Sequence, residues 1–101
     1  MSVTRAWLMA LLIAACDHAP QRHVVVIRGF RFTPDTVRIA PGDTIRWENQ
    51  DFAPHTATSA AGFDSGSLEP GAGWQTVFVS ARAFEYICDL HPSMRGVVIV
   101  E

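Results

Sequence analysis

The sequence contains no lysine, only two cysteines and few charged residues. Charged residues make up 18% of the 101 residues, and 8 basic residues, all arginine, stand against 10 acidic ones for a net charge of −2. Because the arginines are scattered singly, no basic stripe can neutralise a phosphate backbone, which argues against nucleic acid as a partner. No apolar run reaches the roughly 20 residues of a membrane-spanning helix. With 49% hydrophobic residues, the composition is that of one small globular domain.

The longest apolar run lies at the N-terminus and has the form of a secretory signal. Residues 6–16 read AWLMALLIAAC, and Arg5 is the only charged side chain before them. A short basic segment followed by an apolar stretch and small residues is typical of a cleaved signal peptide. We therefore predict a signal peptide over residues 1–15. The rest of the chain is expected outside the cytoplasm, in the periplasm or at the cell surface.

The end of this run resembles the lipobox of bacterial lipoproteins, because residues 13–16 read IAAC. The resemblance implies that cleavage occurs before Cys16 and that its thiol carries lipid, which would anchor the chain at a membrane surface. An ordinary signal peptide with an incidental Cys16 is the alternative. With a lipidated Cys16, residues 16–22 form a short polar tether, and Cys88 is left without a disulfide partner in the chain.

Beyond the tether, short runs rich in β-branched and aromatic residues alternate with turn signals. In one of them, Ile45 and Trp47 alternate with polar residues, which is the period of a strand with one buried face. No later segment shows a sustained helical stripe, so we predict an all-β, antiparallel β-sandwich with Greek-key connections over residues 23–101. Gly29 is expected to form a bulge in the first run. The predicted strands are residues 24–32, 37–40, 44–48, 75–80, 84–88 and 96–100.

Four side chains suited to one metal ion lie in two short segments. Cys88, His91 and Met94 recur at intervals of three, and Met94 is the only methionine after residue 15. His55 lies upstream, in a polar turn after the strand of residues 44–48. One thiolate, two imidazoles and a thioether are the ligand set of blue-copper electron-transfer sites. The sequence therefore predicts one copper ion per chain, cycling between Cu(I) and Cu(II).

Other chemistries suit these residues less well. Zinc is the rival metal, but structural zinc takes four Cys or His ligands, and zinc sites rarely use a thioether. A haem attachment site would need Cys-x-x-Cys-His, which the sequence lacks. A Cys/His nucleophile would need an orienting Asn or Asp and an oxyanion element, and neither is evident. We therefore do not predict an enzyme.

These motifs resemble the cupredoxins, and among them most of all the amicyanins. The resemblance is carried by the short Cys-x-x-His-x-x-Met loop, with Pro92 after the histidine and a Val-rich strand after the loop. It continues upstream through Phe-Thr-Pro, Pro-Gly-Asp-Thr, Ile-Arg-Trp-Glu-Asn and Pro-His, and so covers residues 24–101. It implies a cupredoxin-like sandwich and a type 1 copper site.

The resemblance also implies a role for each candidate ligand. His55, Cys88 and His91 would be equatorial ligands, and Met94 a weak axial one. The imidazole edge of His91 would be the port through which electrons leave. A surface poor in charge around this port suits brief docking with redox partners. The residues expected beside His91 in this patch are Pro54, Pro92, Ser93 and Phe52.

Two positions near the predicted site depart from the family pattern. Thr56 stands where the family commonly has an asparagine that ties the two ligand loops together. The replacement puts that tie in question. Asp89 follows the ligand cysteine, where threonine is common. A carboxylate close to the thiolate would favour Cu(II) and lower the reduction potential.

The sequence as a whole predicts a monomeric, membrane-tethered electron carrier. Its expected partners are redox proteins such as a c-type cytochrome or a dehydrogenase, met transiently. Copper binding and handling is the main alternative, although sites for copper trafficking are typically Met-rich or open. A copper enzyme would need an open coordination position or further histidines, and only His18 and His23 remain, in or next to the tether. A structural lipoprotein without a metal function is the last alternative.

Overall fold

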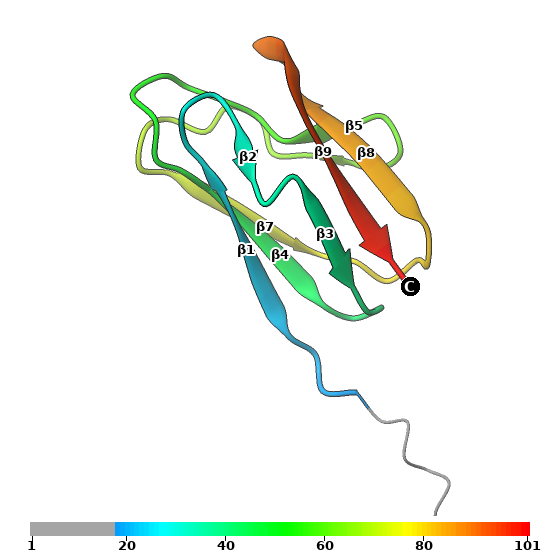
Figure 1. Cartoon of the computed structure of the whole chain (residues 1–101). Coiled ribbons are helices and arrows are strands. Elements are labelled where there is room, and N and C mark those ends of the chain that lie inside the picture. The colour runs from blue at the N-terminus through cyan, green and yellow to red at the C-terminus, as the bar shows by residue number, and fades with distance from the viewer. Residues whose placement is uncertain (1–17) are drawn as a thin grey trace, which may run out of the picture.

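Nine strands and no helix make up residues 18–101, the part of the chain that the computed structural model describes (Figure 1). The predicted signal peptide over residues 1–15 and the predicted lipidation site Cys16 lie outside this part. Within it, no helix is long and apolar enough to span a membrane. The strands are β1 Arg22–Ile27, β2 Phe32–Thr33, β3 Thr36–Ile39, β4 Thr44–Asn49, β5 Thr58–Ser59, β6 Phe63–Asp64, β7 Gly73–Val77, β8 Ala83–Cys88 and β9 His91–Val100.

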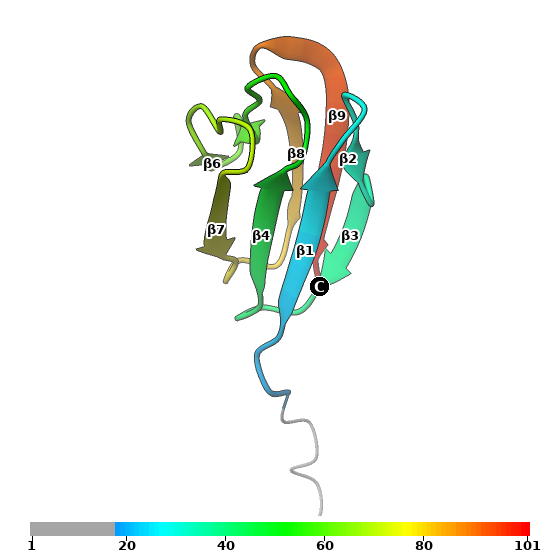
Figure 2. The ribbon, with the colours of Figure 1, turned by 90° about the vertical axis from the view of Figure 1, so that its left-hand side faces the viewer.

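The strands form two sheets that pack face to face, which confirms the predicted β-sandwich. One sheet has the order β2-β1-β4-β7 and the other the order β3-β9-β8-β5-β6. Figure 2 shows the first sheet in front of the second. The sheets are mixed and not purely antiparallel as predicted, because β1 runs parallel to β4 and β3 runs parallel to β9. Parallel neighbours need a crossover between them, and between β1 and β4 the chain crosses to the other sheet to form β3.

The first predicted run is a hairpin and not one bulged strand. Arg28 and Arg31 exchange backbone hydrogen bonds of 3.1 and 3.2 Å between β1 and β2. The two residues between them, Gly29 and Phe30, have φ angles of 64° and 58°. Two successive positive φ angles characterise a type I′ turn, which matches the twist of the flanking strands. Gly29 is therefore a turn residue, and the expectation of a bulge at Gly29 was wrong.

The other predicted runs correspond to strands whose ends differ from the prediction by up to five residues. Residues 37–40, 44–48, 84–88 and 96–100 fall largely within β3, β4, β8 and β9, and residues 75–80 overlap β7. β5 and β6 were not predicted, because strands of two residues are too short to show an alternating pattern. The tether predicted over residues 16–22 ends in β1, which begins at Arg22.

The core between the sheets is centred on Trp47 of β4, which is fully buried. Its ring lies 5.7 Å from that of Trp74 and meets the ring of Tyr86 edge to face at 5.4 Å. Phe63, next to both tryptophans, lies 5.2 Å from Trp47. Large aromatic side chains bury much apolar area in few rotamers. Through the contact of Trp47 with Tyr86, these rings pack β4 against β8. The two segments with the candidate ligands follow these two strands.

Candidate metal centre

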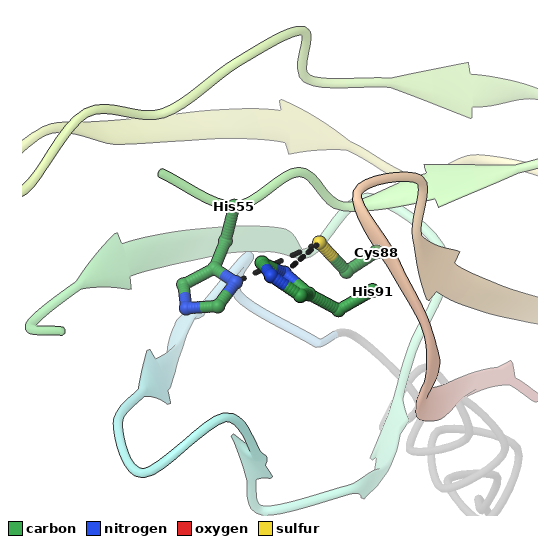
Figure 3. Close-up of side chains that lie close together, drawn as sticks. All are labelled: His55, Cys88 and His91. Atoms are coloured by element: carbon green, nitrogen blue, oxygen red, sulfur yellow. Dashed lines mark hydrogen bonds between the residues drawn. The ribbon is translucent and has the colours of Figure 1, made fainter. Parts of the chain in front are cut away.

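Three of the four predicted ligands come together at one end of the sandwich (Figure 3). His55 lies in the β4–β5 connection, Cys88 ends β8 and His91 begins β9. The Sγ atom of Cys88 lies 3.6 Å from Nδ1 of His55 and 3.7 Å from Nδ1 of His91. All three ligand atoms lie within 4.8 Å of one another. Metal bonds of about 2.0–2.3 Å place neighbouring ligand atoms roughly 3.5–4 Å apart, so these atoms can reach one ion.

The β8–β9 hairpin explains why a cysteine and a histidine three residues apart face each other. Cys88 pairs with His91 across the hairpin, whereas Ile87 pairs with Arg95. The strand irregularity between these pairs leaves three residues of β9 outside the ladder. Met94 is one of them, and its side chain is buried in the hydrophobic core. A single hairpin thus carries three of the four predicted ligands.

His55 is held by both its backbone and its ring. Its backbone N–H donates to the Leu68 carbonyl at 3.1 Å and its carbonyl accepts from the Leu68 N–H at 2.7 Å. Its ring is fully buried, and Nε2 lies 2.8 Å from Oδ2 of Asp51. A carboxylate that accepts from Nε2–H sets the tautomer in which Nδ1 carries the free lone pair. That lone pair belongs to the nitrogen nearer Cys88.

Asp51 joins this histidine to the β1–β2 turn. Its carboxylate accepts from the N–H groups of Gly29, at 2.6 Å, and Phe30, at 2.9 Å. Burial alone would raise the pKa of Asp51, but these amides and the His55 ring together lower it below its usual range. The carboxylate is therefore an anion with three donors around it. Hydrogen bonds to an ionised acceptor are stronger than those between neutral groups.

Thr56 ties the two ligand-bearing segments together. Its backbone N–H donates to Sγ of Cys88 at 3.3 Å, and its hydroxyl oxygen accepts from the Asp89 N–H at 2.8 Å. A threonine hydroxyl therefore supplies a tie at the position where the family commonly has asparagine.

Sequence reasoning missed Asp51 and Phe30. The Phe30 ring meets the imidazole of His55 at 4.9 Å and that of His91 at 4.8 Å, edge to face in both cases. Phe30 lies 25 positions before His55 in the chain, and no local motif links a hairpin turn to a metal ligand so distant in sequence. Only the packing of β1 beside β4 brings them together.

The residues predicted for the patch around His91 lie at the surface. The side chains of Pro54, Pro92 and Ser93 are exposed, and His91 itself is half-buried. Phe52 is fully exposed. The remaining histidines, His18 and His23, contact Asp43 at the opposite end of the sandwich and take no part in this centre.

Comparisons with known proteins agree with this geometry. The profile of the family described as cupredoxin-like domain matches residues 2–100. The amicyanin of Paracoccus versutus is 30% identical over 95 residues, which cover 88% of this chain and 72% of that protein. Amicyanin-alpha of Methylorubrum extorquens is 29% identical over 103 residues, which cover 95% of this chain and 87% of that protein.

Solved structures give the same result. A proline-to-alanine mutant of amicyanin in its oxidized state matches with a TM-score of 0.76 at 28% identity, covering 79% of this chain and 82% of that one. The Cu(I) form of a methionine-to-alanine mutant of amicyanin matches with a TM-score of 0.75 at 27% identity, over 79% and 82% of the two chains. Since the family profile spans nearly the whole sequence and the fold agrees, this chain belongs to the cupredoxin family and is amicyanin-like.

Proposed function

We propose that this chain carries single electrons between extracytoplasmic redox proteins through one copper ion held by His55, Cys88, His91 and Met94. The observation that supports it best is the cluster of two imidazole nitrogens around a buried thiol. This donor set fits copper, because thiolate, thioether and imidazole together suit the ion in both oxidation states. Bound copper supplies the one-electron Cu(I)/Cu(II) couple. As an amicyanin-like cupredoxin, the chain is an electron carrier and not an enzyme.

The protein holds the metal-ligand atoms in fixed positions and shields them from water. Asp51 and Leu68 hold His55, and the Thr56 amide contacts the sulfur of Cys88. The bond to Asp51 leaves Nδ1 of His55 free, and a sulfur that accepts one N–H keeps further lone pairs for a metal. His55 and Cys88 are fully buried, so water is kept from them. Little rearrangement is then needed when an electron arrives or leaves.

His91 is the natural exit for the electron. Of the three clustered side chains, it is the one with exposed surface, whereas His55 and Cys88 have none. Pro54, Pro92 and Ser93 are exposed and uncharged, and we place them in the surface around His91. We take this patch as the docking surface for a c-type cytochrome or a dehydrogenase. Small contacts of this kind suit brief redox encounters, and the chain is expected to act as a monomer.

The proposed location rests on the N-terminal motif. Removal of residues 1–15 and lipidation of Cys16 would leave the domain outside the cytoplasm on a lipid anchor. Intact-mass analysis of protein purified from membranes tests this. A chain that begins at Cys16 and carries diacylglyceryl and acyl groups supports the anchor. An unmodified chain in the soluble fraction would contradict it.

The function is tested by the visible and EPR spectra of metal-free protein after addition of one equivalent of Cu(II). We expect an intense blue band and a narrow copper hyperfine splitting. Both should be lost in Cys88→Ser, since the band arises from thiolate-to-copper charge transfer. A pale spectrum in the wild type would overturn the proposal. Rapid loss of copper to a chelator would instead favour the alternative of an extracytoplasmic copper-handling lipoprotein.

A further inference from the structure

A second polar cluster lies at the end of the sandwich opposite the metal centre. We call this end, where β1 and β4 begin, the base (Figure 1). The carboxylate of Asp43, just before β4, is only 2% exposed. Its Oδ1 accepts from the Gln21 N–H at 2.9 Å and lies 3.1 Å from Nε2 of His18. Its Oδ2 lies 3.0 Å from Nε2 of His23 and accepts from the Ala40 N–H at 3.1 Å.

The four partners of this carboxylate come from two different parts of the chain. Ala40 belongs to the turn between β3 and β4, where an aspartate that accepts from a nearby backbone N–H is ordinary turn chemistry. His18 and Gln21 precede β1 and are not needed for that turn. The hydrogen bonds from His23 and from the Gln21 N–H, followed by the others, hold the pKa of Asp43 far below its usual range. The carboxylate is thus a charged acceptor for the N-terminal segment.

Residues 18–21 have exposed side chains and no regular structure. A segment of this kind near a chain end is normally mobile unless hydrogen bonds tie it down. Here the ties are at both of its ends. His18 contacts Asp43, and Gln21 donates its N–H to the same carboxylate while its carbonyl accepts from the Thr44 N–H at 2.9 Å.

We propose that His18 and Gln21 form a clasp on Asp43, which docks the tether on the base and holds the metal centre facing away from the anchor. The orientation rests on the proposed lipidation of Cys16, whereas the clasp does not. His18 is two residues from Cys16, so at most about 7 Å of extended chain separates them. The base is therefore held close to the lipid headgroups.

The metal centre lies at the other end of the same strands. β1 and β4 run in parallel from the base toward it, paired from Arg22 and Thr44 to Ile27 and Asn49. Six residues of strand span about 17–20 Å. A clasped domain therefore presents His91 to the aqueous side. The partner it fits is a soluble or extrinsic redox protein, and not one whose electron-entry site lies in the bilayer.

The clasp is tested by ¹⁵N relaxation of copper-loaded, reduced protein comprising residues 16–101, which include every residue of the described fold. Cu(I) is diamagnetic, so amide signals near the centre stay sharp. We expect heteronuclear NOE values for residues 19 and 21 close to those of β1. In His18→Ala the value for residue 19 should fall to that of a free chain end, whereas residue 21 keeps its backbone hydrogen bonds and should change little. His23→Gln is the matched control. It removes a histidine from the same carboxylate but leaves both contacts of the tether, so the values should persist.

Low NOE values in the wild type, or a value for residue 19 unchanged by His18→Ala, would overturn the clasp. The orientation is tested on the lipidated protein in phosphatidylethanolamine/phosphatidylglycerol vesicles that carry a headgroup dye emitting in the blue-copper band. Energy transfer from dye to Cu(II) should be weak in the wild type and stronger in His18→Ala. Strong transfer in both would overturn the orientation. Absence of lipid in the mass analysis would overturn the anchor alone and leave the relaxation result standing.

Discussion

Thr56 contacts both ligand-bearing segments through two different groups. The backbone N–H reaches the sulfur of Cys88, and the hydroxyl oxygen accepts from the Asp89 N–H. Only the second contact depends on the side chain, and Thr56 itself is buried. A substitution of Thr56 can therefore remove the hydrogen bond to Asp89 while leaving the backbone hydrogen bond to the sulfur in place.

Thr56→Val, which has nearly the same shape, should leave the Asp89 N–H without its acceptor. A partly buried donor left unpaired costs about 1–3 kcal/mol, so chemical denaturation of the metal-free protein should show a loss of that size. Thr56→Ser keeps the hydroxyl and is the control, for which we expect a smaller loss. Equal stability of Thr56→Val and the wild type would show that the tie contributes nothing.

The carboxylate of Asp51 accepts hydrogen bonds from three donors, one of them the ring of His55. Asp51→Ala should leave the Nε2–H of His55 without its acceptor and loosen the β1–β2 turn. Loss of a group that orients a metal ligand typically weakens metal binding by about 10–100-fold. Competition for Cu(I) with a chelator of known affinity measures this. Gln50→Ala, a neighbouring exposed change without a contact to His55, should have the affinity of the wild type.

At the scale of elements, the β8–β9 hairpin carries three of the four proposed ligands and is packed on its inner side by an aromatic ring. Tyr86 of β8 pairs with Gly96 of β9, and a Cβ placed on Gly96 would overlap the Tyr86 ring. Gly96 is therefore required by close packing and not by its backbone angles. A side chain at this position would have to displace the Tyr86 ring.

Gly96→Ala should destabilise the protein by about 1–3 kcal/mol, the usual cost of overpacking a core. Thermal or chemical unfolding measures the loss. In a Tyr86→Ala background the same substitution should cost much less, because the ring that it would strike is gone. If Gly96→Ala costs the same in both backgrounds, the two residues are not coupled in the way the packing indicates.

At the scale of the whole molecule, the two ends of the sandwich carry different polar clusters. One end holds the proposed copper ligands, and the base holds the Asp43 cluster. The aromatic core around Trp47 lies between them. The same sheets connect the two ends, but the aromatic core separates their polar clusters. Substitutions at the base should therefore leave the copper spectrum unaltered.

Asp43 makes the stability of the molecule depend on pH. Its pKa is lower in the folded protein than the ordinary value of 3.8. As the pH falls through this value, Asp43 is protonated in the unfolded chain before it is protonated in the folded protein. The stabilisation that Asp43 provides is fully present above this pH and is progressively lost below it. The difference in unfolding free energy between the wild type and Asp43→Asn should shrink as the pH falls below about 4. A difference that stays constant in acid would contradict the charged-acceptor role.

Much of the proposed metal centre could be predicted from the sequence, because its key spacing is local. Cys88 and His91 lie within one hairpin, so their order along the chain nearly dictates their proximity. The strands could be predicted as well, wherever β-branched and aromatic residues alternate over four or more positions. The sandwich followed from the strand pattern, and the cupredoxin family was indicated by the resemblance of the ligand loop and the upstream motifs.

What only the tertiary structure decided are the contacts between residues far apart in the chain. No local sequence pattern predicts the parallel pairing of β1 with β4 or the contacts of Phe30 and Asp51 with His55. The same holds for the contact of His18 with Asp43. Each depends on which strands become neighbours, and that choice is made by the packing of two whole sheets around a shared core. The sequence by itself determined the donor set of the proposed site. The folded chain determined what surrounds that site and which way it faces.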